Sequence, residues 1–166
     1  KDGLRPLYRY PTDKLLDDQE MTPTVNAIRL ELEAKFGVGL NHAMIQLYKD
    51  GNAWIGNHSD KSLDMRRGRP FFNLSFGGTR SMVIVDKRAT YSKKKRTYQL
   101  PHNSCMVLGW ETNKYFTHGV PKQKKAAPRM SMVFRSIATF IDDQGTLSGQ
   151  GAPTTNATRV NKDMKK

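Results

Sequence analysis

The stretch Arg129-Met130-Ser131-Met132-Val133-Phe134-Arg135 decides how this chain of 166 residues folds. Residues two apart in a strand share a face, so both arginines lie on one face and apolar side chains fill the other. Two arginines on one face are unusual in a β-core, because a buried guanidinium needs an anionic partner. A guanidinium binds a carboxylate through two hydrogen bonds, so the strand is predicted to bind a carboxylate ligand. The alternative is an edge strand whose arginines face solvent.

Short apolar stretches recur from about residue 40 onward and predict a mainly β fold. Turn-forming Gly, Asn and Pro residues separate these stretches. The predicted strands cover residues 43–48, 71–76, 81–85, 98–100, 104–108 and 130–141. The predicted turns cover residues 50–52, 77–78 and 101–103.

One helix is predicted before these strands. Thr22 is a good N-cap, Pro23 suits the first helical position, and Gly37 ends the run. The fold class is therefore α+β and mainly β, with the helix packed on antiparallel strands as in a double-stranded β-helix, or cupin-like jelly roll. The same pattern of strands and turns is also compatible with an open α+β sheet. The apolar residues at helical spacing are Val25, Ile28, Leu32 and Phe36.

The length suits one domain. We expect it over residues 1–141, with an irregular and helical part over 1–40, the jelly roll over 41–141, and a poorly packed tail over 142–166. A single cysteine and the absence of an apolar run of about 18 residues predict an intracellular protein of the nucleus or cytoplasm, with no membrane contact. We also expect a monomer, and a fragment of a longer chain because the sequence begins at Lys1-Asp2-Gly3 without a methionine or an apolar signal region.

The net charge of +13 is concentrated in the middle of the chain. Residues 61–135 carry 17 basic and 3 acidic side chains, which is a net charge of +14. Such a field attracts polyanions, and nucleic acid above all. A basic run between two predicted strands supplies candidates for phosphate contacts. These candidates are Lys93, Lys94, Lys95 and Arg96. The alternative is a solvated face that only keeps the protein in solution.

The unit His58-Ser59-Asp60 is a candidate metal site. An imidazole and a carboxylate two residues apart can converge on one ion, and a second histidine would complete a facial triad suited to Fe(II). His118, at the end of an aromatic stretch, is the best third ligand; His42 comes next, and His102 lies in a turn. The alternative for His58 and Asp60 is an ordinary surface turn.

The order of these motifs resembles the AlkB-like family of Fe(II)/2-oxoglutarate-dependent dioxygenases, over about residues 41–140. The family pattern places Asn, Tyr and Gly before His-x-Asp, then a Ser-Leu/Phe-Gly strand, a distal His-Gly and a final motif with two arginines. The matching residues are Asn41, Ile45, Tyr48, Gly51, His58, Asp60, Leu74–Gly77, His118–Val120 and Arg129–Arg135. The resemblance implies Fe(II), 2-oxoglutarate and O2 as cofactors, with iron bound by His58, Asp60 and His118.

The resemblance also implies a co-substrate site. Arg129 and Tyr48 would bind the distal carboxylate of 2-oxoglutarate, and Arg135 would lie by the end nearest the metal. Gln46 and Ser131 stand where the family has asparagine. Both can still form hydrogen bonds, so we expect a working site with altered contacts.

For the substrate, the resemblance implies that the N-terminal third forms a nucleotide-recognition lid. Tyr8, Arg9 and Tyr10 are residue types that stack on a base and bind a phosphate, and Trp54 is a further stacking candidate. Asp64 is the nearest candidate for the family's nucleotide-contacting carboxylate. The alternative for the aromatic residues is packing in the core.

The sequence therefore predicts an oxidative demethylase of N-alkylated bases in DNA or RNA, as in DNA repair. Decarboxylation of 2-oxoglutarate to succinate and CO2 would be coupled to hydroxylation of the N-alkyl group, and formaldehyde would be released. Single strands are the preferred substrate, because a paired base must first be flipped out. Two alternatives are a hydroxylase or demethylase of a protein or small molecule with the same cofactors, and a non-enzymatic basic jelly roll that binds RNA.

Overall fold

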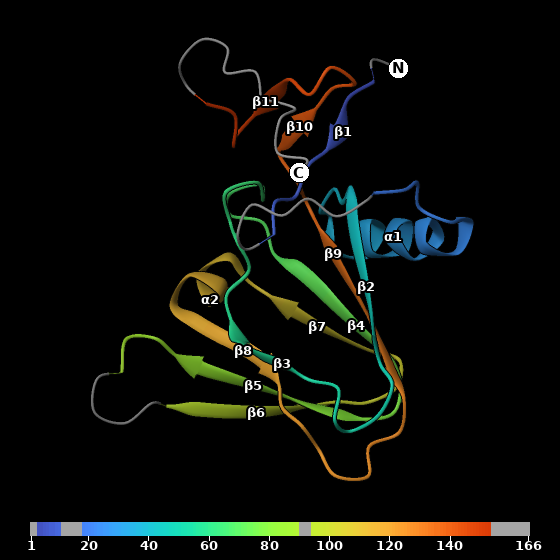
Figure 1. Cartoon of the computed structure of the whole chain (residues 1–166), viewed down its shortest axis with the longest axis vertical. Helices are drawn as coiled ribbons and strands as arrows, with labels where there is room; N and C mark the ends of the chain where they lie inside the picture. The colour runs from blue at the N-terminus through green and yellow to red at the C-terminus, as the bar shows by residue number, and fades with distance from the viewer. Residues whose placement is uncertain (1–2, 11–17, 90–93, 154–166) are drawn as a thin grey trace, which may run out of the picture.

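The computed structural model describes residues 3–10, 18–89 and 94–153, and Figure 1 shows their arrangement. Two antiparallel sheets face each other and form the predicted jelly roll, which confirms the fold class. The first sheet has the order β2 (His42–Tyr48), β9 (Arg129–Arg135), β4 (Phe71–Gly77) and β7 (Ser104–Leu108). The second has the order β3 (Ile55–His58), β8 (Phe116–Val120), β5 (Arg80–Asp86) and β6 (Lys95–Leu100).

Strand β9 lies between β2 and β4, so the solvent-facing edge-strand alternative is wrong. Its two arginines face the space between the sheets and are almost fully buried, with 1% and 2% of their surface exposed for Arg129 and Arg135. Its other face carries Met132 and Phe134, which are also buried. A strand buried on both faces and paired on both edges cannot shift register without exposing its apolar side chains, so β9 holds its arginines in fixed positions.

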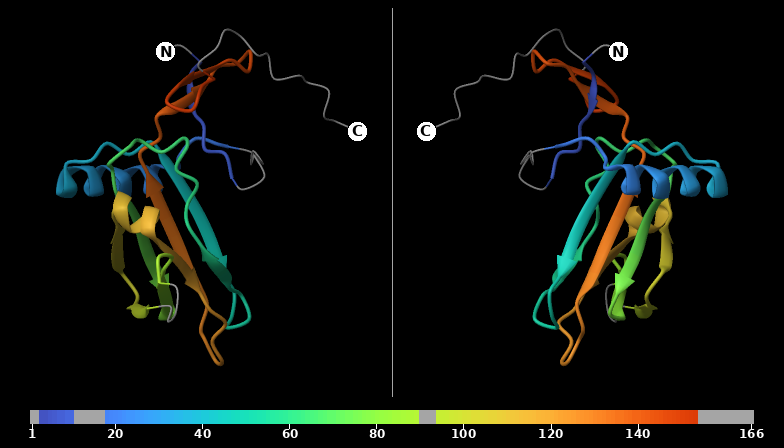
Figure 2. Two further views of the ribbon diagram at one scale, coloured as in Figure 1. Left: turned by 90° about the vertical axis from the view of Figure 1, so that its left-hand side faces the viewer. Right: turned by 90° about the vertical axis from the view of Figure 1, so that its right-hand side faces the viewer.

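Helix α1 (Pro23–Phe36) covers the outer face of the first sheet, and Figure 2 shows it crossing the strands near one end. The helix has the predicted ends. The Thr22 hydroxyl accepts a hydrogen bond from the Val25 amide, and Gly37 adopts the left-handed conformation at φ 63°. The apolar side of the helix packs on the sheet. The buried members of this cluster are Val25, Leu32, Val38, Leu40, Phe72, Met132 and Phe134.

The predicted strand over residues 130–141 is divided in the structure. Strand β9 ends at Arg135, and β10 (Thr139–Ile141) pairs instead with β1 (Arg5–Pro6) and β11 (Leu147–Gly149) in a small sheet at one end of the molecule (Figure 1). The Asn41 side chain accepts from the Ile137 amide at 2.7 Å and donates to its carbonyl at 3.0 Å. The Asn41 side chain therefore pairs with the N–H and C=O groups of Ile137, which a continuous strand would pair with a neighbouring strand.

The structure also corrects the expectation of a poorly packed tail. Residues 142–153 pack on the rest of the chain, since β11 pairs with β10 and the Gln150 side chain donates to the carbonyls of Leu63 and Met65. Residues 154–166 lie outside the described part. The short helix α2 (Trp110–Tyr115) was not predicted either. In the described ranges, the structure has no helix of the length and apolarity that crossing a membrane requires.

Candidate metal and co-substrate site

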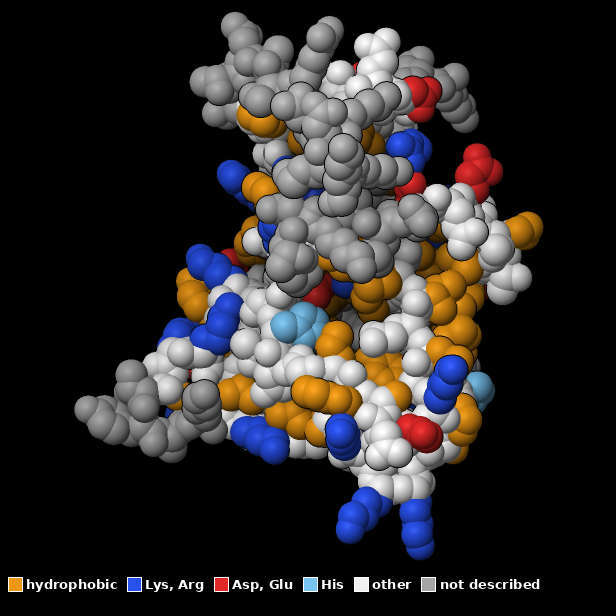
Figure 3. All heavy atoms as spheres, viewed as in Figure 1, with side chains coloured by type: hydrophobic (Ala, Val, Ile, Leu, Met, Phe, Trp, Pro, Cys, Tyr) orange, Lys and Arg blue, Asp and Glu red, His pale blue; other side chains and the backbone are white. Residues whose placement is uncertain are grey.

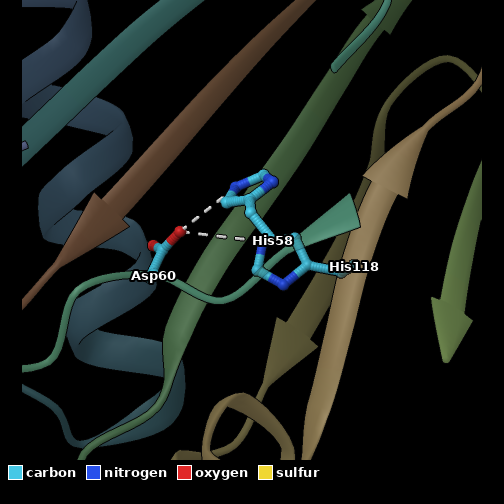
Figure 4. A group of neighbouring side chains, drawn as sticks. All are labelled: His58, Asp60 and His118. Carbon is cyan, nitrogen blue, oxygen red and sulfur yellow. Dashed lines mark ion pairs between the residues drawn. The ribbon is translucent and has the colours of Figure 1, made fainter. Parts of the chain in front are cut away.

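Two histidines and one aspartate meet between the sheets. His58 ends β3, His118 lies directly opposite it in β8, and Asp60 follows β3 by two residues. The Asp60 Oδ1 atom lies 3.6 Å from His58 Nε2 and 3.7 Å from His118 Nε2. Figure 4 shows the carboxylate facing both rings, and one ligand atom of each residue lies within 4.8 Å of the others. In the described part of the chain, this is the group of His, Cys, Asp and Glu side chains close enough to share a metal ion.

Backbone features fix the two imidazoles. Gly119 lets β3 approach β8 closely, because a Cβ atom there would lie 2.5 Å from Asn57 Oδ1 and 2.9 Å from the Ile55 carbonyl. His58 Nδ1 lies 2.8 Å from the Gly56 carbonyl. A carbonyl only accepts, so Nδ1 carries the proton and Nε2 keeps its lone pair for a metal.

Asp60 is held at both its side chain and its backbone. Arg135 donates to Oδ2 from Nε at 2.8 Å and from Nη2 at 2.7 Å, which leaves Oδ1 toward the histidines. The Asn113 amide accepts from the Asp60 backbone N–H at 2.8 Å and donates to its carbonyl at 2.9 Å. Asn113 comes from α2, so this helix positions the loop that carries the ligand.

The charges suit a divalent cation. Burial alone would raise the pKa of Asp60, but the Arg135 guanidinium and then the contact with His58 outweigh it and hold that pKa below its usual range. Burial lowers the pKa of His118 to about 4, so this imidazole is neutral near pH 7. The pKa of His58 is raised, chiefly by its contact with Asp60. A carboxylate and a neutral imidazole are the protonation states that bind metals, and two histidines with one carboxylate fit Fe(II).

Arg129 has the environment of an anion-binding group. Its Nη2 donates to Ser75 Oγ at 2.7 Å and to Asn73 Oδ1 at 3.2 Å, and both partners are neutral. Its buried Nε and Nη1 have no hydrogen-bond partner among the described residues. The guanidinium lies 5.1 Å from the centre of the Tyr48 ring. A buried cation with unsatisfied donors is costly, so this end of the cavity favours a bound carboxylate.

A second buried arginine lies beside it. Arg80 is fully buried and donates to the carbonyls of Asp50, Ala53 and Pro121 at 2.7–3.0 Å. Its guanidinium lies 5.5 Å from the Tyr48 ring, so two cations flank this tyrosine. Burial, helped by the repulsion of Arg80 and opposed by the attraction of Tyr48, lowers the pKa of Arg129. Arg80 therefore adds positive potential at the end of the cavity where Arg129 lies.

The cavity between the sheets runs from Tyr48, Asn73 and Ser131 to the metal triad and Arg135. Arg129 does not line the cavity itself, but it contacts Tyr48 and Asn73, which do. The two residues that depart from the family pattern, Gln46 and Ser131, lie opposite each other in register. The Gln46 side-chain oxygen accepts a hydrogen bond from the Tyr48 hydroxyl at 3.1 Å. Gln46 and Ser131 therefore both line the cavity near Tyr48, where the sequence predicted altered contacts with 2-oxoglutarate.

The predicted base-contacting residues of the N-terminal segment pack against the core in this structure. Tyr8 is buried, with the Arg135 guanidinium 4.8 Å from its ring centre. Arg9 and Asp64 form an ion pair with each other, and the Asp64 carboxylate also accepts the Arg9 backbone N–H at 2.9 Å. Tyr8, Arg9 and Asp64 thus join the N-terminal segment to the core, and base contacts by these residues stay a prediction. Tyr10 is half-buried and packs edge-on against Tyr8 at 4.9 Å.

The remaining predicted contacts lie at the surface. Trp54 is 56% exposed and precedes β3 at the end away from His58, with Lys122 Nζ 5.9 Å from its ring centre. The loop and strand residues Lys94, Lys95 and Arg96 are exposed, and Lys93 lies outside the described residues. Their phosphate contacts stay a prediction.

Sequence reasoning missed Asn73, Arg80 and Asn113. A signal existed for Asn73, because Asn73 and Ser75 alternate with bulky apolar residues in β4 and so mark a polar face inside a core strand. Arg80 and Asn113 gave no local signal, because their partners lie 27–53 residues away in the sequence.

Comparisons with known proteins agree with this geometry. A family model described as the 2OG-Fe(II) oxygenase superfamily matches residues 1–161. The DNA oxidative demethylase ALKBH2 of Bos taurus is 30% identical over 128 residues, which is 74% of this chain and 46% of the relative. The ALKBH2 of Homo sapiens is 31% identical over 128 residues, which is 74% of this chain and 49% of the relative. The human alpha-ketoglutarate-dependent dioxygenase alkB homolog 3 is 23% identical over 145 residues, covering 83% and 50%. The chain spans about half the length of these curated relatives.

Proposed function

The chain belongs to the 2OG-Fe(II) oxygenase superfamily and is AlkB-like, and from this premise we propose that it is an oxidative demethylase of N-alkylated nucleic-acid bases. The substrates would be the N-alkylated base, 2-oxoglutarate and O2. The products would be succinate, CO2 and an N-hydroxyalkyl base, which loses formaldehyde when the alkyl group is methyl and regains its N–H. One observation carries the proposal: a single cavity has a metal triad at one end and an arginine with unpaired buried donors behind its other end.

Each residue of the site has a role in this reaction. His58, Asp60 and His118 would hold Fe(II), and Arg135 would keep the Asp60 carboxylate ionised and oriented. Bound Fe(II) supplies the activation of O2 that couples decarboxylation to hydroxylation. Arg129 would bind the far carboxylate of 2-oxoglutarate, and Tyr48 lies beside that guanidinium.

Two observations favour nucleic acid as the substrate. The segment of residues 61–135, which contributes His118, Arg129 and Arg135, carries the net charge of +14, and polyanions are attracted to such a field. The ALKBH2 relatives are described as DNA oxidative demethylases. The His58 side chain is 34% exposed, so the triad can be approached from solvent. A single-stranded substrate would present its base without the cost of unpairing.

Formaldehyde release tests the proposal. The protein is loaded with Fe(II) and 2-oxoglutarate and offered N-methylated single-stranded DNA and RNA, with the unmethylated strands as controls. We expect formaldehyde only from the methylated strands and none from the variant Asp60→Ala. If the protein forms succinate but no methylated strand yields formaldehyde, the nucleic-acid proposal is wrong.

A second candidate function is hydroxylation or demethylation of a protein or small molecule. The specific observation in its favour is that Asp64, the candidate base-contacting carboxylate, is fully buried and paired with Arg9. Under this alternative, succinate formation would rise with methylated peptides or small amines and not with oligonucleotides.

A further inference from the structure

A second hollow lies beside the metal triad and shares Asp60 with the cavity between the sheets. It holds about 760 Å³ between α2 and the loop of residues 61–67. We call it the basic cleft, because Lys61, Arg67, Lys87 and Lys114 all line it, together with Trp110 and Gln150. Figure 3 shows Lys and Arg side chains gathered on the left of the visible face, on the side where Figure 1 places α2 and β5.

Basic side chains outnumber acidic ones in the lining of the basic cleft. Asp60 is the one carboxylate among its described lining residues, and Arg135 already neutralises it from the cavity side. The exposed Lys87 lines the cleft, and its ammonium donates to Ser59 Oγ at 3.0 Å and to the Asn113 carbonyl at 3.4 Å. Hydroxyl and amide groups of the lining can also donate to phosphate oxygens, so the cleft suits an anion with many acceptors.

Hydrogen bonds hold the two walls in place relative to the triad. Asn113 ties α2 to the Asp60 backbone by two hydrogen bonds. On the other wall, Gln150 donates to the carbonyls of Leu63 and Met65, and its side-chain oxygen accepts from the Arg67 amide at 3.3 Å. Since both walls end on the segment that carries Asp60, a chain bound in the cleft lies directly beside the metal ligands.

We propose that the basic cleft binds the phosphate backbone of a single-stranded nucleic acid and so places a neighbouring nucleotide at the metal triad. This inference rests on the proposed function and assigns it a binding surface. A nucleic acid carries one negative charge per nucleotide, which matches the four cations of the lining. It also offers flat bases, and the side chain of Trp110, which packs on the core on one side, lines the cleft as well. An acidic peptide is attracted by the same charges but has no base to stack on Trp110.

The size of the effect follows from counterion release. For single strands, each neutralised phosphate contributes about 0.7 to the slope of log affinity against log salt. Removing two cations of the cleft should therefore lower the slope by about 1.4, so that the loss of affinity between 50 and 200 mM salt becomes about sevenfold smaller.

The test is fluorescence anisotropy of the metal-loaded full chain with an unmethylated single-stranded oligonucleotide, at several salt concentrations. The variant R67Q/K114Q neutralises both walls of the cleft. The matched control K35Q/K49Q removes the same charge from exposed positions on α1 and after β2. We expect weaker binding and the flatter salt slope in R67Q/K114Q, for all oligonucleotide sequences alike, and wild-type slope in the control.

Two outcomes would overturn the inference. If R67Q/K114Q and K35Q/K49Q lose oligonucleotide affinity equally, the net charge of the protein attracts the oligonucleotide without a defined site. If polyglutamate displaces the oligonucleotide from the wild type at equal charge concentration, and R67Q/K114Q weakens both ligands equally, the cleft is a site for acidic peptides. The assay uses no methylated base, so its failure is distinct from failure of the proposed function, which formaldehyde release by the wild type reports.

Discussion

Replacing Arg129 by methionine should have opposite effects on stability and on co-substrate binding. Arg129 is buried, pairs with two neutral side chains, and has two N–H-bearing nitrogens without a partner among the described residues. An unsatisfied buried polar group costs about 1–3 kcal/mol. A methionine of similar length removes that cost, so the free energy of unfolding of the protein without 2-oxoglutarate should stay constant or rise.

Binding of 2-oxoglutarate should weaken sharply in the same variant. Removing one partner of a buried charge pair costs about 2–5 kcal/mol, because the remaining carboxylate is left unpaired. This corresponds to a loss of affinity of about 30-fold to several thousand-fold. A ligand at 100 times its Kd stabilises the folded state by about 2.7 kcal/mol, and after a 100-fold loss of affinity the same concentration contributes about 0.4 kcal/mol.

The assay is thermal unfolding with and without 2-oxoglutarate, in the presence of Mn(II) and without O2, together with calorimetric titration. The matched control is Arg69→Met, which removes an exposed arginine from the loop before β4. A second ligand, 2-oxobutanoate, keeps the keto-acid end and lacks the far carboxylate. If Arg129→Met binds 2-oxoglutarate like the wild type, or loses both ligands equally, then Arg129 does not bind the far carboxylate and our reasoning is refuted.

Three further predictions concern the surrounding residues. Asp60→Asn should abolish Mn(II) binding in a titration and lower the free energy of unfolding by about 3–5 kcal/mol, because Arg135 loses its buried anion; retained metal binding would remove Asp60 from the ligand set. Tyr8→Ala should lower the free energy of unfolding by about 3–5 kcal/mol in urea unfolding, because Tyr8 is buried against Arg135. Replacing the exposed Tyr98 by alanine should change this free energy by less than about 0.5 kcal/mol. Burial lowers the pKa of His42 from 6.5 to about 3. The charge of Arg135 lowers this pKa further, and the charge of Asp60 opposes the shift. The Tyr8 ring also lies against the His42 ring. The unfolded chain therefore binds the proton first, and stability should fall from about pH 6.5 toward pH 3 by up to about 1.4 kcal/mol per pH unit. His42→Gln should flatten this slope in urea unfolding at several pH values, and an unchanged slope would show that His42 does not contribute.

The sequence by itself determined the elements whose signals are local. The N-cap at Thr22, the left-handed position at Gly37 and the helical spacing between them predicted α1 with its bounds. Alternation predicted most strands and the inward face of β9. The chemistry of His58 and Asp60, two residues apart, predicted a metal site for the same reason: the geometry of a short extended segment fixes which side chains lie together.

Tertiary structure alone decided which distant groups became partners. Asp64 and Arg9 lie 55 residues apart, and each has the chemistry for a nucleotide contact, yet they pair with each other. Residues 130–141 have one continuous strand pattern, but the Asn41 amide at Ile137 divides them between two sheets. Asn113 came to position the Asp60 loop because α2 packs beside it. Periodicity records the conformation of a few consecutive residues, whereas a hydrogen-bond partner depends on which segments the folded core brings within about 3 Å.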